Sequence, residues 1–412
     1  MKNYIEHIKS FDSNVKNTII FSFFFNLANA VFNVIYNLYL LKMNFNEESI
    51  GKIISAGSLG VIIFSFLSIF FASKLGYKKH MIIFLIFSSI FNLSRILIIN
   101  QYLYWLNVLA SGTIFSMSVL VYPLIIGSAK KESLTYAFGL NFFVSWLALT
   151  IGNLIGGYLP EIFKILTFNT IFSYRATLVM GTMFMTLSII PITKLKISAN
   201  HKSQYLSIEK ITKIFKDKED LKIMERYFII SFVIGLAAGL FVPFFNVILK
   251  ATFNMNSGNI GIIMAISQIL TAIGGIIGPL IAEKIGRVKT VVLLNMISIP
   301  FLIIMALTDI TAVFLTSFLL RNIFMNMGEP VSSSFILSNI KDDKKIVLNS
   351  LVSVFFQLGW FIQAPIAGNF MIRFGYSFVF ILAASIYSVR ALLYYVFFKN
   401  SDKTFTVKNQ SL

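Results

Sequence analysis

The sequence predicts an all-α membrane protein in which twelve transmembrane helices form two six-helix bundles, related by a pseudo-twofold axis along the membrane normal. Three observations predict this fold: an apolar composition, twelve apolar runs and an internal repeat. Hydrophobic residues make up 57% of the 412 residues, charged residues make up 13%, and the mean hydropathy is +0.81. A soluble domain is about half apolar and about a quarter charged. The composition therefore indicates a chain that lies in a lipid bilayer.

Twelve runs are long enough to cross a bilayer, since one helical span needs about 20 apolar residues. The first six runs cover residues 18–41, 53–73, 80–99, 102–127, 135–159 and 173–193. The second six cover residues 226–249, 259–282, 290–308, 310–338, 346–370 and 376–398. The sequence therefore predicts a bundle over 1–193, a cytoplasmic linker over 194–225, a second bundle over 226–398 and a cytoplasmic tail over 399–412.

The linker carries a short helical pattern. Ile208, Ile211 and Phe215 keep helical spacing among lysines and acids. This pattern predicts an amphipathic helix on the inner membrane surface. A solvated linker is the alternative interpretation.

The net charge of +18 reflects topology. If the N-terminus is cytoplasmic, 26 of the 35 Lys and Arg fall on the cytoplasmic side. Six fall outside: Lys42, Lys52, Lys164, Arg175, Lys250 and Arg373. This positive-inside bias places both termini in the cytoplasm, and it accounts for the basicity without a nucleic-acid partner. The Ile-, Asn-, Lys- and Phe-rich composition is typical of an AT-rich bacterial genome, so we expect the cytoplasmic (inner) membrane of a bacterium.

Several chemistries are excluded. The chain has no cysteine, and His7, His80 and His201 all fall at predicted cytoplasmic positions. No metal-ligand cluster and no nucleophile–base pair lies within the spans, and the phosphate-binding loop G-x-x-x-x-G-K-[ST] is missing. The sequence therefore predicts no enzyme, metal, cofactor or ATP-driven pump. A passive channel or a membrane receptor is the alternative of another class.

The two halves resemble each other. With a shift of 209, "SFFFNLANAVFNVIYN" (22–37) lies over "SFVIGLAAGLFVPFFN" (231–246), so Asn37 lies over Asn246. With a shift of 210, "ASKLGYKK" (72–79) lies over "AEKIGRVK" (282–289). Two halves repeated in the same orientation are typical of transporters, with a substrate site at mid-depth between them.

One loop resembles a known signature. The segment "GPLIAEKIGRVK" (278–289) is similar to the loop between helices two and three of the major facilitator superfamily. Its matching residues are Ile281, Ala282, Glu283, Lys284, Gly286 and Arg287, with Pro279 at the position of a glycine. The first copy keeps Lys74 and Gly76. Ser73 replaces its acid and Ile69 its glycine.

The resemblance covers residues 15–400 and implies a secondary transporter that cycles between inward-open and outward-open states. It also implies that spans one, four, seven and ten line a central cavity. The loop residues that it assigns to gating are Lys74, Gly76, Glu283, Lys284, Gly286 and Arg287. Glycine is expected to end the helix before each loop in a left-handed turn.

Span one carries a column of amides. Asn26, Asn29, Asn33 and Asn37 fall within about 80° of arc on one helix face. An amide exposed to hydrocarbon costs several kcal/mol, so this face must contact water or protein. We expect it to line the substrate cavity, with polar contacts between helices as the alternative.

Span ten repeats the pattern in "RNIFMNMGEPVSSSF" (321–335). Asn322, Asn326, Glu329 and Ser333 fall within about 60° of arc, and Arg321 lies beside them. Glu329 is the one acid inside any predicted span and precedes a proline, which loosens the helix.

These charges suggest a coupling mechanism. A charged group at mid-bilayer usually marks function, so we hypothesise that Glu329 is the proton-coupling acid. Arg321 is then its modulating cation or a site for an anionic substrate group. A static structural pair is the alternative, although eight residues span about 12 Å of helix and argue against direct contact. Arg95 and Arg390 lie nearer span ends, and we expect them to extend to the interface.

Span five contains "ALTIGNLIGGYLP" (148–160). Gly152, Gly156 and Gly157 resemble a motif of antiporter members of the superfamily, with Asn153 in the position of its proline. Close helix packing is the alternative reason for these glycines. Tyr122-Pro123 and Phe241-Val242-Pro243 are expected to kink spans four and seven.

The remaining cavity candidates are aromatic and amide residues: Tyr36, Tyr122, Trp146, Asn246, Gln268, Gln357 and Trp360. The favoured function is proton-coupled export (efflux, as an antiporter) of an amphiphilic small molecule by alternating access. The alternative is uptake of a small polar or anionic solute. The expected partners are a small-molecule substrate, protons and the lipid bilayer, with the protein as a monomer.

Overall fold

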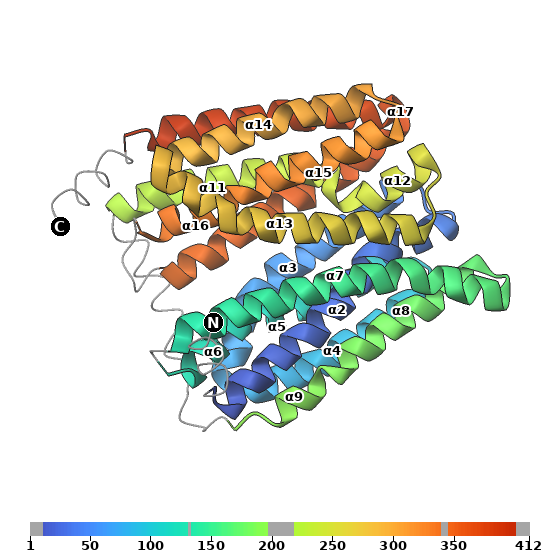
Figure 1. Ribbon diagram of the computed structural model, residues 1–412. Coiled ribbons are helices and arrows are strands. Elements are labelled where there is room, and N and C mark those ends of the chain that lie inside the picture. Colours follow the sequence, from blue (N-terminus) through green and yellow to red (C-terminus); the bar gives the residue numbers. More distant parts are fainter. Residues whose placement is uncertain (1–10, 131–132, 197–217, 339–344, 401–412) are drawn as a thin grey trace. The chain divides into compact units, whose positions relative to one another are not determined.

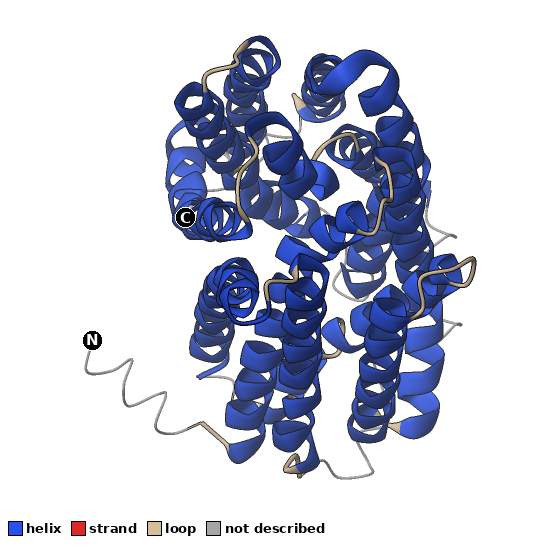
Figure 2. Ribbon diagram, turned by 90° about the vertical axis from the view of Figure 1, so that its right-hand side faces the viewer, coloured by secondary structure: helices blue, strands red, loops and turns tan. Residues whose placement is uncertain are grey.

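The computed structural model describes residues 11–130, 133–196, 218–338 and 345–400, which form helices joined by short turns (Figure 1). No strand occurs among these described residues, as Figure 2 shows. The chain divides into two compact units. Unit 1 comprises Met1–Asn46, Lys52–Ser207 and Asn246–Ala265, and unit 2 comprises Glu47–Gly51, Ile208–Phe245 and Ile266–Leu412. Each unit is therefore one half of the sequence with a short piece of the other.

The described part of the first sequence half forms α2 (Ser13–Lys42), α3 (Glu47–Leu75), α4 (Tyr77–Leu97), α5 (Leu103–Ser118), α6 (Val121–Ser128), α7 (Leu134–Thr167), α8 (Thr170–Leu187) and α9 (Ile189–Thr193). The second forms α11 (Lys218–Gly239), the 3-10 helix η2 (Val242–Phe244), α12 (Phe245–Phe253), α13 (Ser257–Ile285), α14 (Arg287–Leu307), α15 (Thr311–Met327), α16 (Glu329–Ser338) and α17 (Lys345–Phe398). The predicted amphipathic pattern of Ile208, Ile211 and Phe215 lies outside the described residues.

The predicted spans each have a helical counterpart. Within the described residues, ten helical stretches are long and apolar enough to cross a membrane. These ten count Leu351–Phe398 once, although Gly375 (φ 78°, ψ 173°) interrupts α17 between the last two predicted spans. They also leave out α15 and α16, which together cover the predicted span 310–338. With these two additions the twelve-span prediction and the all-α fold class are confirmed.

Four of the predicted spans are interrupted, and each break lies three to five residues before a proline. The helices that end there are α5 at Ser118 before Pro123, α8 at Leu187 before Pro191, α11 at Gly239 before Pro243 and α15 at Met327 before Pro330. A proline cannot donate to the carbonyl four residues earlier, and its ring clashes with that carbonyl. The kinks predicted in spans four and seven and the loosening of span ten are confirmed.

Two glycines end helices in the repeated loops. Gly76 (φ 73°) separates α3 from α4, and Gly286 (φ 90°) separates α13 from α14. A positive φ of this size is accessible to glycine at little cost and is strained for other residues. Both copies therefore have a glycine with positive φ at this turn, but its ψ (157° and 155°) lies outside the left-handed helical region that was expected.

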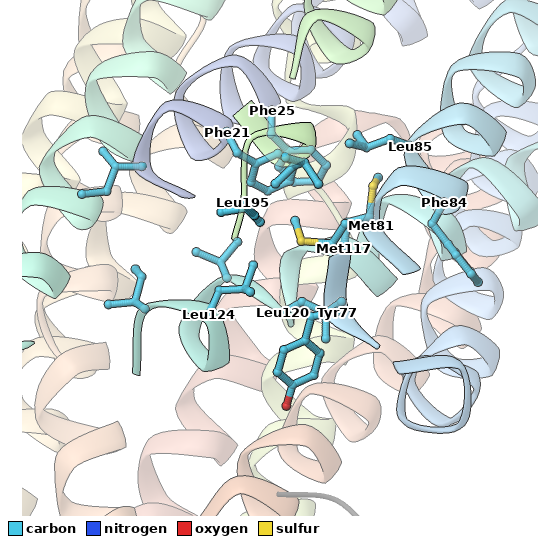
Figure 3. Packing of buried hydrophobic residues seen from close by; sticks show 14 of the residues in the cluster. Phe21, Phe25, Tyr77, Met81, Phe84, Leu85, Met117, Leu120, Leu124 and Leu195 are labelled. Atoms are coloured by element: carbon cyan, nitrogen blue, oxygen red, sulfur yellow. The ribbon is translucent and has the colours of Figure 1, made fainter. Parts of the chain in front are cut away.

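The core of unit 1 joins α2 to α4, α5 and the end of α9 (Figure 3). Phe21 and Phe25 stack with ring centroids 5.1 Å apart. Met81, Met117 and Leu195 belong to the same buried cluster. Because α2 contributes to this core along one face and packs on α7 and α8 along others, it is the central helix of its unit.

The core of unit 2 joins α11, α14, α16 and α17. Tyr227 stacks on Phe398 with ring centroids 4.7 Å apart, and Val291, Val331 and Tyr394 pack in the same cluster.

Some helices approach until their backbones touch. A Cβ placed on Gly157 of α7 would lie 2.8 Å from the Cα of Gly261 in α13 and 2.7 Å from the carbonyl oxygen of Ser257. In unit 2, a Cβ on Gly359 of α17 would lie 2.6 Å from the backbone nitrogen of Leu236 in α11. Small residues allow such crossings between membrane helices.

We expect Gly261→Ala to destabilise the protein, since its Cβ would meet the Asn153 carbonyl oxygen at 2.5 Å and the Gly157 Cα at 2.8 Å. Neither backbone atom can move alone, so the cost should be about 1–3 kcal/mol. The matched control in the same helix is Gly275→Ala, whose Cβ meets only Pro330 Cγ, at 3.8 Å. That change should be neutral or stabilising by up to about 1 kcal/mol. Thermal unfolding in detergent, followed by tryptophan fluorescence, measures both; equal melting temperatures would contradict the backbone contact.

Candidate functional site

Over residues 25–40, α2 has one open face, and four asparagines form it. We call these residues the α2 amide stripe: Asn26, Asn29, Asn33 and Asn37. Between residues 25 and 40, all the residues except these four asparagines are buried. Asn33 is exposed and the other three are partly exposed. Along this stretch of the helix, the polar residues are therefore the part that protein does not cover.

The other open faces of unit 1 have a different character. Phe66 of α3 and Phe143 of α7 are 51% and 61% exposed, as expected of side chains that meet lipid. Amides in contact with hydrocarbon would cost several kcal/mol each. The α2 amide stripe is thus suited to water or to a polar ligand rather than to acyl chains.

Two of these amides are fixed by their own helix. Asn26 Nδ2 donates to the Ser22 carbonyl at 2.7 Å, and Asn29 Nδ2 donates to the Phe25 carbonyl at 2.9 Å. One N–H of each amide is thereby satisfied without a neighbour. The amide oxygen, which can accept two hydrogen bonds, is left to interact at the open face.

Asn37 and Asn246 contact each other. Asn37 Nδ2 donates to Asn246 Oδ1 at 3.3 Å, and Asn246 Nδ2 donates to the carbonyls of Val34 (2.8 Å) and Asn33 (3.1 Å). These are the two asparagines that the shift of 209 superposes. Asn246 is 2% exposed, so it acts within unit 1 as a buried clamp between α12 and α2.

The polar stripe of span ten lies in unit 2, on α15 and α16. Asn322, Asn326 and Ser333 are partly exposed and Glu329 is exposed. Asn326 Nδ2 donates to the Asn322 carbonyl at 2.8 Å, as in the α2 amide stripe. Asn322 also donates to Ser267 Oγ of α13, which ties the stripe to its neighbouring helix.

Arg321 is buried beside this stripe, with 3% of its side chain exposed. Its guanidinium carbon lies 4.8 Å from the ring centroids of both Phe241 and Tyr387. Its Nη1 donates to Asn322 Oδ1 at 3.2 Å. Cation–π contacts of this kind stabilise a desolvated arginine by up to about 2 kcal/mol each.

Glu329 is the first residue of α16, directly after the break at Gly328. Tyr394 of α17 interacts electrostatically with both Glu329 and Arg390. The acid therefore has a polar neighbour on α17, whereas Arg321 contacts Phe241, Tyr387 and Asn322.

Arg95 and Arg390 do not extend to the interface, so that expectation is wrong. Their side chains are 6% and 3% exposed. Arg95 Nη1 donates to Asn107 Oδ1 at 3.1 Å, and Arg390 Nη1 donates to Asn295 Oδ1. Arg95 also lies 4.5 Å from the Tyr36 ring centroid. Amide acceptors and ring faces on neighbouring helices hold these charges inside, and both amides lie within predicted spans, which was the available signal.

The other predicted cavity residues are placed differently from one another. Tyr36 is buried, and its hydroxyl accepts a hydrogen bond from Asn107 Nδ2 at 3.0 Å. Tyr122 on α6 is 57% exposed. The partly exposed candidates are Trp146, Gln268, Gln357 and Trp360.

In the repeated loops, Lys74 Nζ lies 4.3 Å from the Phe70 ring centroid. Arg287 Nη1 donates to Ser338 Oγ at 3.1 Å, and Glu283 and Lys284 are exposed.

Sequence reasoning missed a carboxylate that caps a helix in unit 1. Glu161 Oε1 of α7 accepts from the Ser257 backbone N–H at 3.2 Å and from its Oγ at 2.7 Å. Ser257 is the first residue of α13. An acid at a helix N-terminus is favoured by the helix dipole and by the free N–H groups. Its partner lies 96 residues away, so only its place at a span end could have suggested the contact.

Unit 2 has two further carboxylate contacts that were missed. Glu47 Oε1 accepts from the Tyr376 hydroxyl at 2.6 Å, and Glu48 Oε2 accepts from Asn369 Nδ2 at 3.3 Å. Both acids lie in the first turn of α3. They tie the start of α3 to α17.

No group of three or more His, Asp or Glu side chains in the described part of the chain could hold a metal ion. The helices, the repeat and the polar stripes define a multi-pass membrane protein of the transporter class. The chain belongs to the major facilitator superfamily, whose family model matches residues 18–221 and 227–411. Membership of this family indicates a transporter rather than an enzyme.

Solved structures share the fold at low sequence identity. The nucleoside transporter NupG has a TM-score of 0.76 and 14% identity, covering 94% of this chain and 99% of that chain. A bacterial homolog of the human lysosomal transporter Spinster, inward-facing, has a TM-score of 0.76 and 10% identity over 93% and 96%. A D-xylose–proton symporter has a TM-score of 0.74 and 11% identity over 96% and 98%. No curated protein sequence matches the chain.

We expect Asn246→Leu to lower the melting temperature, because it removes both donors to α2 and leaves Asn37 without this acceptor. Losing partners of buried polar groups costs about 1–3 kcal/mol. The same substitution at exposed Asn33 should change the free energy of unfolding by no more than about 0.5 kcal/mol. If thermal unfolding in detergent ranked the two variants in the opposite order, the clamp would not be structural.

Proposed function

We propose that this protein is a secondary active transporter that takes up a small polar solute by alternating access. The observation that carries the proposal is the α2 amide stripe, an open polar face on a helical stretch (25–40) that is otherwise buried. Fixed amides present hydrogen-bond acceptors in a known direction and lose little entropy on binding. A polar solute can use such a surface, whereas an amphiphile would leave its amides unpaired.

The predicted export of an amphiphilic compound receives less support. Its sequence basis was Glu329, an aromatic-rich and weakly charged interior, and the glycine motif of span five, and helix packing accounts for those glycines. A Cβ on Gly152 would lie 2.6 Å from the Leu27 carbonyl oxygen, and one on Gly156 would lie 3.0 Å from the Val31 Cα. The structural neighbours that carry D-xylose with protons, or nucleosides, are consistent with polar cargo. Export stays the alternative direction.

Proton coupling is assigned to Glu329. It is an exposed acid inside a predicted span, next to a helix break and to Tyr394. An ionisable group inside a membrane span is energetically costly and usually marks function. Protonation removes its charge, so the carboxyl can cross a low-dielectric environment in one half of the cycle and ionise in the other.

The broken helices support a bending motion. Spans four, seven and ten are interrupted at prolines, and helix interruptions at mid-membrane free backbone groups and allow segments to tilt. We place the protein in the cytoplasmic membrane as a monomer, with both termini in the cytoplasm and no cofactor. A channel or a receptor would need none of these hinges.

We expect a screen of nucleosides, pentoses, hexoses and small organic acids to yield compounds that raise the melting temperature of the purified protein, since ligands stabilise the form they bind. Such a compound should then show counterflow in proteoliposomes. A channel would show no counterflow, and a receptor would move nothing. Either outcome would reject the transporter proposal.

For coupling, Glu329→Gln should retain counterflow and lose at least about tenfold of the accumulation driven by an imposed pH gradient. Counterflow requires only exchange of the loaded carrier, whereas accumulation requires the proton. The matched control is Asp309→Asn, a change at an exposed acid in the turn before α15, which should keep both activities. Undiminished accumulation in Glu329→Gln would reject this residue as the coupling acid.

A further inference from the structure

Arg321 is held in one orientation by three neighbours. The rings of Phe241 and Tyr387 each lie 4.8 Å from its guanidinium carbon, and Asn322 Oδ1 accepts from Nη1. Asn322 is itself fixed by its donation to Ser267 Oγ. The guanidinium is therefore pre-positioned, with little side-chain entropy left to lose on binding a ligand.

Two of its donors are unpartnered. Nε and Nη2 of Arg321 are buried, and neither has a hydrogen-bond partner among the described residues. These two nitrogens form one edge of the planar guanidinium, and their N–H groups point the same way. This edge is the fork that bonds both oxygens of a carboxylate at once.

The other two membrane-buried arginines differ from Arg321 at this edge. In Arg95 and Arg390, Nε is buried without a partner, but Nη2 is not among the buried unpartnered atoms. Each also donates through Nη1 to an asparagine, as Arg321 does. Burial and an amide anchor are thus shared by the three arginines, whereas Arg321 is the one of the three in which both Nε and Nη2 are buried without a partner.

The cost of burying Arg321 also favours a bound anion. An unpaired guanidinium inside a membrane protein is energetically costly, and each buried N–H without an acceptor adds to that cost. An amide oxygen and two ring faces offset part of it, but they supply no negative charge. A bound anion would satisfy both donors and neutralise the charge.

We propose that Arg321 binds the carboxylate of the transported solute through its Nε–Nη2 edge, so that the substrates are small organic carboxylates. The inference rests on the proposed transport function and deepens it by naming the substrate class. The polar stripe of span ten begins at Asn322, the residue that anchors Arg321. This stripe supplies hydrogen bonds to the rest of the bound solute.

Burial of the fork has a role in this scheme. A carboxylate reaches these nitrogens only when the neighbouring side chains move apart. When they close again, the bound carboxylate neutralises the charge of Arg321 and accepts its two free hydrogen bonds. The anion therefore stabilises the closed form more than the open form, which is the condition for a ligand to shift a conformational equilibrium.

The test measures melting temperatures of the full-length protein in detergent with benzoate, acetate and inorganic phosphate, and with benzamide as the uncharged isostere of benzoate. Benzoate or acetate should raise the wild-type value by a few degrees, and benzamide should not. Arg321→Lys should abolish the shift, because lysine keeps the charge and lacks the fork. Arg95→Lys, a change at an equally buried arginine, should retain the shift.

The other outcomes overturn the proposal. An equal shift in melting temperature with benzamide would show that the protein binds the aromatic ring of the ligand rather than its carboxylate. A shift with phosphate alone would show that the site prefers a different anion. A shift retained in Arg321→Lys, or no shift with either carboxylate in the wild type, would also reject it. Because binding in detergent needs no transport, carboxylate binding without counterflow would reject the proposed function and leave the site assignment standing.

Discussion

No water reaches the hydrocarbon core of a bilayer, so each polar side chain there must find its partner within the protein or within an aqueous pocket. This constraint explains most of the polar contacts in the chain. Asn26 and Asn29 bond to their own helix, Asn246 bonds to α2, and Arg95 and Arg390 bond to amides. Polar groups that have no such hydrogen-bond partner are the ones available to a ligand.

The fold was predictable because its signals are local or periodic. Apolar runs mark the spans, a proline follows each of the four mid-span breaks, and glycine marks the turns at 76 and 286. Proline is not sufficient by itself, since four other prolines lie inside continuous helices. The α17 helix shows the limit of this reasoning, since its two predicted spans are joined through Gly375 with almost no intervening loop. Run length alone could not fix where one helix stops and the next begins.

The candidate site was predictable only in part. The α2 amide stripe follows from helical spacing, and its open face agrees with that reading. The partners of buried charges do not follow, because Arg95 with Asn107, or Glu161 with Ser257, depends on how helices pack around one another. An arginine in a span has the same sequence signature whether it reaches the interface or a neighbouring amide, and packing decides between them.

The uneven covering of α2 restricts how that helix can move. Rolling it about its long axis by one residue, about 100°, would lift buried phenylalanine and valine side chains out of contact and press amides into an apolar seam. Tilting or sliding together with α7 and α8 disturbs neither. We therefore expect α2 to move as a rigid body together with α7 and α8. Its amide stripe would then keep the same orientation relative to these two helices throughout the transport cycle.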